Sequence, residues 1–181
     1  MFTRFFTLAL LIPTFSLAQN WPERVLETID VKQAAFCNIS GAYNHEAIKA
    51  RNSKNQIKMK MVRDERADNL TAILPEKTFS NWVVRVEEVE LLEDGSASFT
   101  ATLNCDVELS TDRNAAFRIA PDSLVFKQLA QASARDFVLM SGNFTRDFAG
   151  EDVYTTKSGV DVVEGLKVDY KIQVESLVRF E

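Results

Sequence analysis

Apolar and polar side chains alternate without interruption from Ser98 to Leu109. Successive side chains of a β-strand point to opposite sides, so this pattern predicts a single strand with one buried and one solvated face. The inward positions are Phe99, Ala101, Leu103, Cys105, Val107 and Leu109, and the outward positions are Ser98, Thr100, Thr102, Asn104, Asp106 and Glu108. The strand is therefore expected to carry Cys105 toward the core.

Residues 81–92 form the preceding strand candidate, and its apolar positions change phase midway. Trp82, Val84 and Val86 are even-numbered, whereas Val89 and Leu91 are odd-numbered. A slip of one residue, here at Glu87 and Glu88, is what a β-bulge produces. The pattern therefore predicts a long, bulged first strand.

Turn residues at 93–96, including an Asp-Gly pair, separate these two strands. Three further strands are predicted: a short one at 117–119, one over Phe137–Phe144, and a last one from 168 to 180 after a long polar loop. A compact helix with Ser123 at its start, and with Leu124, Val125, Phe126 and Leu129 as its apolar side, is predicted between the third and fourth strands.

The chain before Pro75 has helical rather than alternating spacing. Residues 21–36 are predicted to contain one short helix. Asn44 is a candidate N-cap for a longer helix, which would place His45 in its first turn and would end at Pro75. The apolar positions of this helix change face along its length, which predicts a bend or break between residues 62 and 67.

This order of elements favours an α+β fold. Five strands with a bulged first strand and a helix between strands three and four are the order of an OB-fold, a five-stranded and partly open barrel. A β-sandwich lacks the inserted helix, and a parallel α/β fold needs helices between most strands. We therefore predict N-terminal helices over residues 19–76 and a five-stranded OB-like barrel over residues 77–181, with another α+β arrangement as the alternative.

Three segments resemble a family of exported bacterial proteins of uncharacterised chemistry that have a helical front and an OB-like back. The segments are Asn55–Arg66 (NQIKMKMVRDER), Asn81–Val83 at the start of the first strand, and Asp136–Phe144 (DFVLMSGNF). The resemblance covers much of residues 36–180, and the chain departs from the family pattern at Val84, where the family has Gly. It implies a fold and export, and it assigns no catalytic residue.

Residues 1–18 have the pattern of a secretory signal peptide. Arg4 supplies a positive start, residues 5–15 are mainly apolar, and Ser16 and Ala18 are small residues at a cleavage site. The apolar stretch is shorter than the roughly 20 residues that span a bilayer. We therefore predict a periplasmic or secreted protein with no transmembrane anchor after cleavage, and a retained N-terminal membrane helix is the alternative.

The chain contains two cysteines, Cys37 and Cys105, and one histidine. The cysteines are too far apart for a C-x-x-C redox motif, and there is no zinc-ligand set. In an oxidising compartment the simplest expectation is a single structural disulfide between them. Two separately buried thiols are the alternative.

Sequence motifs for catalysis are missing. The chain has no G-x-S-x-G elbow, no P-loop, no H-E-x-x-H and no dinucleotide fingerprint, so we predict neither a metal nor a cofactor. A carboxylate-based hydrolase remains an alternative because acidic residues are abundant. Nucleic-acid binding is disfavoured, because the net charge is −5 and the outward face of residues 98–109 has no basic or aromatic side chain for phosphates and bases.

The leading hypothesis is a non-catalytic exported binding module that contacts a protein, a peptide or an envelope glycan. OB-folds bind ligands through the outer face of their second and third strands and through flanking loops. The candidate ligand-binding residues are Thr100, Thr102, Asn104, Arg146 and Asp147.

Residues 44–66 offer an alternative interaction surface, because they carry seven basic side chains against three acidic ones. Charge separated in this way steers acidic partners toward one part of a protein. The second hypothesis is therefore an envelope adaptor or an enzyme inhibitor that acts through Lys54, Lys58 and Arg66. The competing interpretation is a solvated helix whose basic face compensates the negative charge of the acidic barrel beside it.

Overall fold

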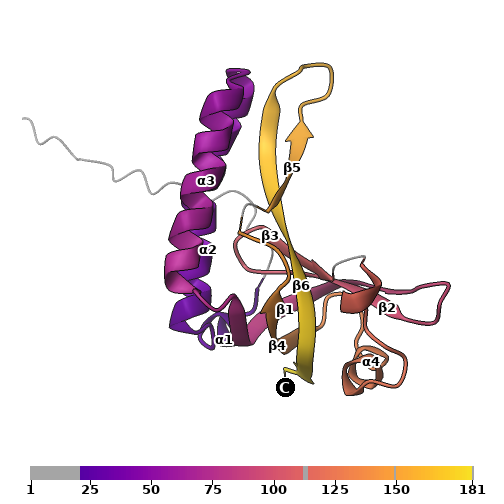
Figure 1. The fold of residues 1–181 in the computed structure, drawn as a ribbon. Helices are drawn as coiled ribbons and strands as arrows, with labels where there is room; N and C mark the ends of the chain where they lie inside the picture. The colour runs from indigo at the N-terminus through magenta and orange to yellow at the C-terminus, as the bar shows by residue number, and fades with distance from the viewer. Residues whose placement is uncertain (1–20, 112–113, 149, 181) are drawn as a thin grey trace, which may run out of the picture.

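Two long helices stand beside a curled sheet in the computed structural model, which describes residues 21–111, 114–148 and 150–180 (Figure 1). The predicted signal peptide, residues 1–18, lies outside the described residues. Within the described ranges, no helix has the length and apolar character needed to cross a membrane. The chain order is helices first and strands afterwards, so the α+β prediction is confirmed.

The front of the chain folds differently from the prediction. A one-turn helix, α1 (Glu23–Leu26), is followed by α2 (Val31–Asn52). The side chain of Asp30 accepts hydrogen bonds from two backbone N–H groups of the first turn of α2, so Asp30 is the N-cap. The predicted start at Asn44 and His45 is therefore wrong, because both residues lie inside α2.

The predicted break between residues 62 and 67 is also wrong, because α3 (Gln56–Ile73) runs through it. The chain turns earlier, at residues 53–55, where Lys54 adopts a left-handed backbone conformation with φ 54°. The prediction counted Met61 as a core position, but it is 64% exposed, whereas Val62 is buried. The correct buried face of α3 needs no bend.

Six strands follow: β1 (Thr78–Leu91), β2 (Ala97–Thr102), β3 (Val107–Thr111), β4 (Phe137–Phe144), β5 (Glu151–Thr156) and β6 (Val163–Arg179). The order in the sheet is β3-β2-β1-β4-β6-β5, and neighbours in this order are antiparallel. A parallel pairing of β3 with β6 closes strands β1, β2, β3, β6 and β4 into a ring of five. β5 pairs with the N-terminal half of β6 and adds a sixth strand outside that ring.

The single strand predicted over residues 98–109 is in fact two strands. The chain reverses at residues 103–106, where Asp106 has φ 59° and the Leu103 N–H donates to the Val107 carbonyl oxygen at 2.8 Å. Leu103 and Val107, on either side of this reversal, both point into the core. The turn therefore keeps the alternation in phase, and alternation by itself does not report the direction of the chain.

The other strand predictions have mixed outcomes. Residues 115–117 form a 3-10 turn, and Ile119 makes only an isolated bridge to Ala97, so the strand predicted at 117–119 is wrong. The long polar loop before the last strand contains β5. In β6 the pairing with β4 shifts at residues 174–176, which turns Val178 outward so that it is 53% exposed.

Several local predictions are confirmed. The register of β1 shifts between Val86 and Glu88, which is the predicted bulge, and β4 has the predicted bounds. Ser123 caps α4 (Leu124–Leu129) through a hydrogen bond from the Phe126 N–H. Leu124 is a correction, because the prediction placed it on the buried side of α4 and it is 68% exposed.

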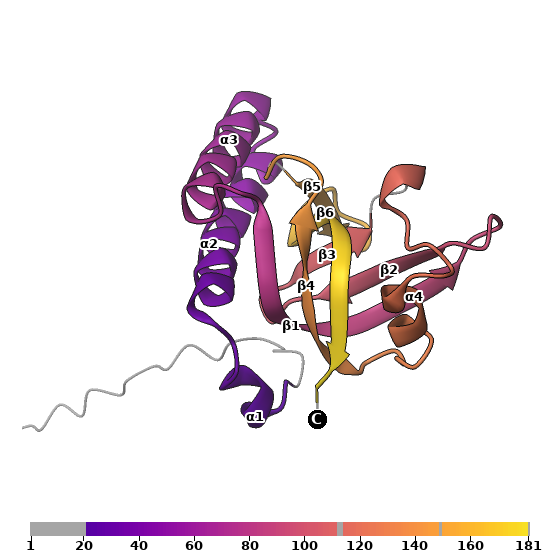
Figure 2. The same ribbon diagram turned by 60° about the horizontal axis from the view of Figure 1, so that its bottom comes forward.

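The long helices are fastened to the ring by an aromatic cluster and a disulfide. The ring centroid of Phe36 in α2 lies 5.0 Å from that of Trp82 in β1 and 5.2 Å from that of Tyr170 in β6. Cys37 forms the predicted disulfide with Cys105 in the β2–β3 turn, with the Cα atoms 5.5 Å apart. Figure 2 shows the other end of the molecule, where the β1–β2 hairpin extends away from α2 and α3.

Candidate functional site

A polar pocket of about 470 Å³ lies on the outer face of β1, β2, β3 and β6. We call it the outer-face pocket. Its charged and hydroxyl-bearing lining residues are Glu88, Glu90, Ser98, Thr100, Glu108, Ser110, Thr111, Arg118, Asp169 and Lys171. Four of these side chains are carboxylates and two are cations, so the pocket has an excess of negative charge.

The sheet register explains why these residues meet. Glu88 lies opposite Thr100, Thr100 opposite Ser110, and Ser110 opposite Lys171, so one row crosses four strands. Side chains directly opposite one another on one face lie about 5 Å apart at Cβ. The pocket is thus a property of the assembled sheet.

A hydrogen-bond network forms the floor of the outer-face pocket. The Ser110 hydroxyl donates to Asp169 Oδ1 at 2.8 Å, and Lys171 Nζ donates to Ser110 Oγ at 3.0 Å. Lys171 Nζ also forms an ion pair with Asp169. Ser110 and Asp169 are 9% and 8% exposed, so this network is largely removed from water and its charges cancel locally.

Two further charges of the lining are neutralised by partners. Lys167 Nζ lies 2.5 Å from Glu108 Oε2, and Arg118 Nη1 lies 2.6 Å from Asp94 Oδ2. These pairs are partly exposed, and they hold the side chains at the edge of the pocket. With these two pairs neutralised, the excess negative charge of the pocket lies on the carboxylates of β1.

Glu88 and Glu90 carry that excess. The Glu90 carboxylate accepts only a 3.3 Å hydrogen bond from the Ser98 hydroxyl, and the Glu88 carboxylate has neither a hydrogen bond nor an ion pair within the part of the chain that the structure describes. Both residues are exposed and alternate along one face of the strand. The outer-face pocket therefore presents two carboxylates that no cation of the described residues neutralises.

Thr100 is the only predicted ligand-binding residue that lines this pocket. Thr102 is on the outer face too, but it is fully buried in the row between Arg85 and Glu108. The nearby Glu87 carboxyl is held by Arg85. Burial raises the pKa of this carboxyl, and its interactions with Arg85, Thr102 and Lys167 together outweigh burial, so the pKa lies below its ordinary value. Thr102 is therefore inaccessible to a ligand.

The other three predicted ligand-binding residues lie elsewhere. Asn104 is in the β2–β3 turn, with its Oδ1 3.4 Å from the disulfide sulfur of Cys37. Arg146 pairs with Glu151 at 3.4 Å, and Asp147 is an exposed neighbour of Arg146 after the end of β4. These residues do not line the outer-face pocket.

The predicted basic surface is divided by the structure. Lys54 Nζ lies 3.4 Å from Asp161 Oδ2, and Lys58 Nζ lies 3.5 Å from Glu46 Oε2, so both lysines face acidic neighbours in solvent. Arg66 is fully buried. The prediction that Arg66 belongs to an accessible surface is therefore wrong.

Arg66 forms a buried ion pair instead. Its Nη1 lies 3.0 Å from Asp152 Oδ1, and the Asp152 side chain is also fully buried. Arg63 reaches the other Asp152 oxygen at 2.5 Å, and the Arg66 guanidinium lies 6.0 Å from the Tyr170 ring centroid. Three charged side chains therefore fasten α3 to β5. This supports the interpretation that basic residues of the helix compensate the charge of acidic residues of the sheet.

Most of the outer-face pocket was not predicted from the sequence. The parallel β3–β6 pairing brings together Ser110, Asp169 and Lys171, and no local sequence pattern predicts this pairing. One signal was present, because Asp169 and Lys171 occupy the polar positions of an alternating strand.

Comparison with models of known protein families finds no match, and neither a curated protein nor a solved structure matches the chain.

Proposed function

We propose that this protein is an exported, non-catalytic binding module that holds a cationic segment of a protein or peptide in the outer-face pocket. The observation that carries the proposal is the pair Glu88 and Glu90, two carboxylates that have no cationic partner among the described residues and that lie above a floor whose charges are already balanced. A Lys or Arg side chain of a ligand would supply the missing charge and donate hydrogen bonds to both carboxylates.

The strand connections support an OB-like identity for residues 77–181. The ring β1-β2-β3-β6-β4 is closed by a parallel β3–β6 pair, and α4 lies between β3 and β4 in the chain. OB-folds bind ligands across strands two and three, and the outer-face pocket covers these two strands. The proposed site is thus where such a barrel would hold its ligand.

The floor network favours binding over hydrolysis. Ser110 resembles a nucleophile beside a lysine, but the Ser110 hydroxyl donates to Asp169. Lys171 donates to both Ser110 and Asp169, and an ammonium in an ion pair has no lone pair with which to accept the hydroxyl proton. The three residues therefore stabilise one another and the sheet.

The lining also favours a cationic ligand over a nucleic acid. Bound nucleic acid needs cations for its phosphates and exposed aromatic rings on which bases stack. The one aromatic residue of the lining, Phe99, is 1% exposed, and the pocket carries excess negative charge. Phosphates would be repelled there.

The Cys37–Cys105 disulfide supports export, because disulfides persist in oxidising compartments and are rare in the cytosol. This agrees with the signal-peptide prediction for residues 1–18. Detection of the mature protein in the periplasmic fraction, with a new N-terminus after residue 18, tests export separately from binding.

Titration with a Lys/Arg-rich peptide tests the binding proposal, with amide chemical shifts as the measurement. We expect shifts at β1 and β2, and at least a tenfold loss of affinity in the double variant Glu88→Gln, Glu90→Gln. A control with the same change of charge, Glu23→Gln with Glu27→Gln in and after α1, leaves the affinity within about twofold. Equal losses in both double variants would show that only net charge attracts the peptide and would overturn the site.

A second variant tests the location by shape. Thr100→Tyr places a large side chain in the outer-face pocket without changing the charge. Loss of peptide binding with an unchanged unfolding midpoint is the expected result, and full retention of binding would contradict the proposal.

A further inference from the structure

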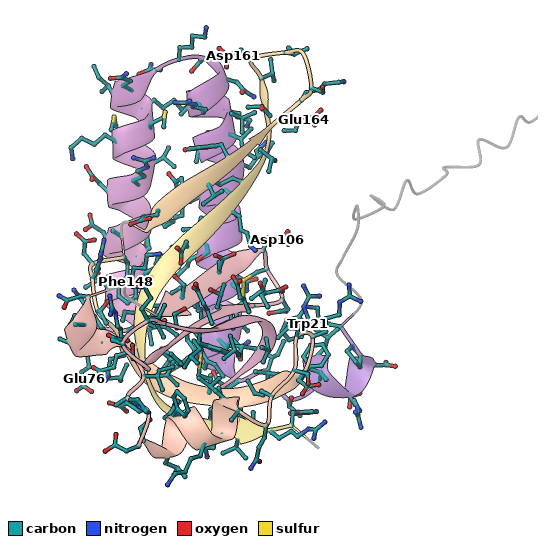
Figure 3. The ribbon with its side chains drawn as sticks, turned by 90° about the vertical axis from the view of Figure 1, so that its right-hand side faces the viewer. Trp21, Glu76, Asp106, Phe148, Asp161 and Glu164 are labelled. Carbon is teal, nitrogen blue, oxygen red and sulfur yellow. A yellow bond between two sulfur atoms is a disulfide. The ribbon has the colours of Figure 1, made fainter. Side chains whose placement is uncertain are left out.

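Two adjoining pockets lie at the end of the molecule where the α2–α3 turn meets the β5–β6 hairpin. Their volumes are about 400 Å³ and about 520 Å³, and both are lined by Arg51, Gln56 and Met59. We call their union the tip groove. Figure 3 labels Asp161 at this end of the molecule, beside the connection between the two long helices.

The tip groove has fixed walls. The Asn52 side chain donates to the Val163 carbonyl oxygen at 3.2 Å and accepts from the Val163 N–H at 2.7 Å, which fastens the end of α2 to the start of β6. Lower down, Arg63 is bound to the buried Asp152 of β5. The helices and the β-hairpin are therefore held at a set separation, and a ligand would meet a preformed groove.

Arg51 is the exceptional cation of this groove. Lys54 pairs with Asp161, Lys60 with Asp64, and Arg63 with Asp152. Arg51 has no acidic partner within the described residues, and its guanidinium lies 5.5 Å from the centroid of the Tyr154 ring. A guanidinium that rests on an aromatic face keeps its N–H donors available to a carboxylate.

The two lysine pairs do not close the groove. The side chains of Lys54 and Asp161 are 79% and 85% exposed, and those of Lys60 and Asp64 are 76% and 57% exposed. Ion pairs with this exposure contribute little and exchange readily with other partners. A bound anion would therefore gain attraction from Lys54 and Lys60 as well as from Arg51.

We propose that the tip groove docks an acidic segment of a partner protein, with a carboxylate on Arg51 and an apolar side chain on Met59. The length of the groove across two pockets, and the thioether at their junction, fit an extended segment better than a compact inorganic anion.

This site is independent of the outer-face pocket and carries the opposite charge. It also replaces the predicted interaction set, because Lys54 lines it whereas Lys58 faces Glu46 and Arg66 is buried. The tip groove would bind an acidic partner, as was expected of Lys54, Lys58 and Arg66, but at a different place on the helices.

An acetylated peptide of alternating Glu and Leu, titrated into the full mature protein, tests this proposal. We expect amide shifts confined to residues 51–60 and 154–163, with a dissociation constant of about 1 mM or tighter. Arg51→Gln is expected to weaken binding about tenfold, and Met59→Ser to weaken it several-fold. Lys49→Gln makes the same change of charge on α2 outside the groove and is expected to leave binding unchanged.

Four outcomes would overturn the proposal. The first is no amide chemical shift in these residues at about 10 mM peptide, and the second is an equal loss of peptide affinity in Arg51→Gln and Lys49→Gln. The third is tighter binding of inorganic phosphate than of the peptide. The fourth is a concentration-dependent self-association of the protein that alone accounts for the shifts. The double variant Glu88→Gln, Glu90→Gln is expected to bind the acidic peptide as the unaltered protein does, so the two proposed sites can fail separately.

Discussion

The side-chain amide of Gln33 in α2 forms two hydrogen bonds with the backbone of Val83 in β1. Gln33 Nε2 donates to the Val83 carbonyl oxygen at 2.8 Å, and the Val83 N–H donates to Gln33 Oε1 at 2.9 Å. The pairing of β1 with β2 begins only at Arg85, so Val83 has no strand on this side. Gln33 takes the place of a neighbouring peptide group there and closes the edge of the sheet.

Gln33→Ala is expected to lower the free energy of unfolding by about 2–6 kcal/mol. The substitution leaves a buried N–H and a buried C=O without partners, and each costs roughly 1–3 kcal/mol. Urea denaturation followed by tryptophan fluorescence measures the change. The exposed Gln131, changed to Ala in the same way, is expected to shift stability by less than about 0.5 kcal/mol. Similar small changes in both variants would mean that water or a backbone shift replaces the Gln33 amide.

Arg66→Met is expected to destabilise the protein by about 3–5 kcal/mol, because it leaves the fully buried Asp152 with one of its two cations. Arg63→Met is expected to cost less, because its side chain is 39% exposed and water can replace it. Thermal unfolding of the two variants gives the ranking. If Arg63→Met were the more damaging change, Arg66 would not be the principal support of the Asp152 carboxylate.

Removal of the disulfide is expected to cost about 4 kcal/mol in the chain-entropy model, because the bridge joins residues 68 positions apart. The double variant Cys37→Ala, Cys105→Ala and the reduced unaltered protein are expected to lose similar amounts in urea denaturation. A reduced protein as stable as the oxidised one would show that packing of α2 alone holds the helices to the ring.

Stability is expected to depend on Asp94 in acid. Hydrogen bonds from the Ser96 hydroxyl and backbone N–H, and then from Arg118, lower the pKa of the Asp94 carboxyl from 3.8 to about 2. A lowered pKa means that the stabilisation is complete above pH 3.8 and is lost as the pH falls through about 2. Asp94→Asn is therefore expected to flatten the fall of the unfolding midpoint between about pH 4 and pH 2. Glu93→Gln is the adjacent control and is expected to leave that slope unchanged.

The pocket residues followed from the sequence only in part. Thr100 was predicted from its polar position in an alternating stretch, because alternation assigns side chains to faces. Glu88 was predicted only as part of the bulge in the first strand, and its place beside Thr100 depends on the register of two strands. Asp169 joins the site from a position far along the chain, through a parallel pairing that needs the whole ring.

The sequence by itself determined the local features, because caps, bulges and turns depend on a few adjacent residues. It placed the Ser123 cap, the slip in β1 after Val86 and the bounds of β4 correctly, and it paired Cys37 with Cys105 because no other cysteine exists.

Only the tertiary structure decided where the charges lie. Arg66 falls one helical turn after Val62 and one before Leu70, all on one face, and whether that position meets water depends on what packs against it. Here the carboxylate of Asp152 does so from a strand 86 residues away. An ion pair of this kind leaves no periodic signal, because the attraction that offsets the desolvation of its two charges depends on a partner that the tertiary fold brings close, which local spacing does not encode.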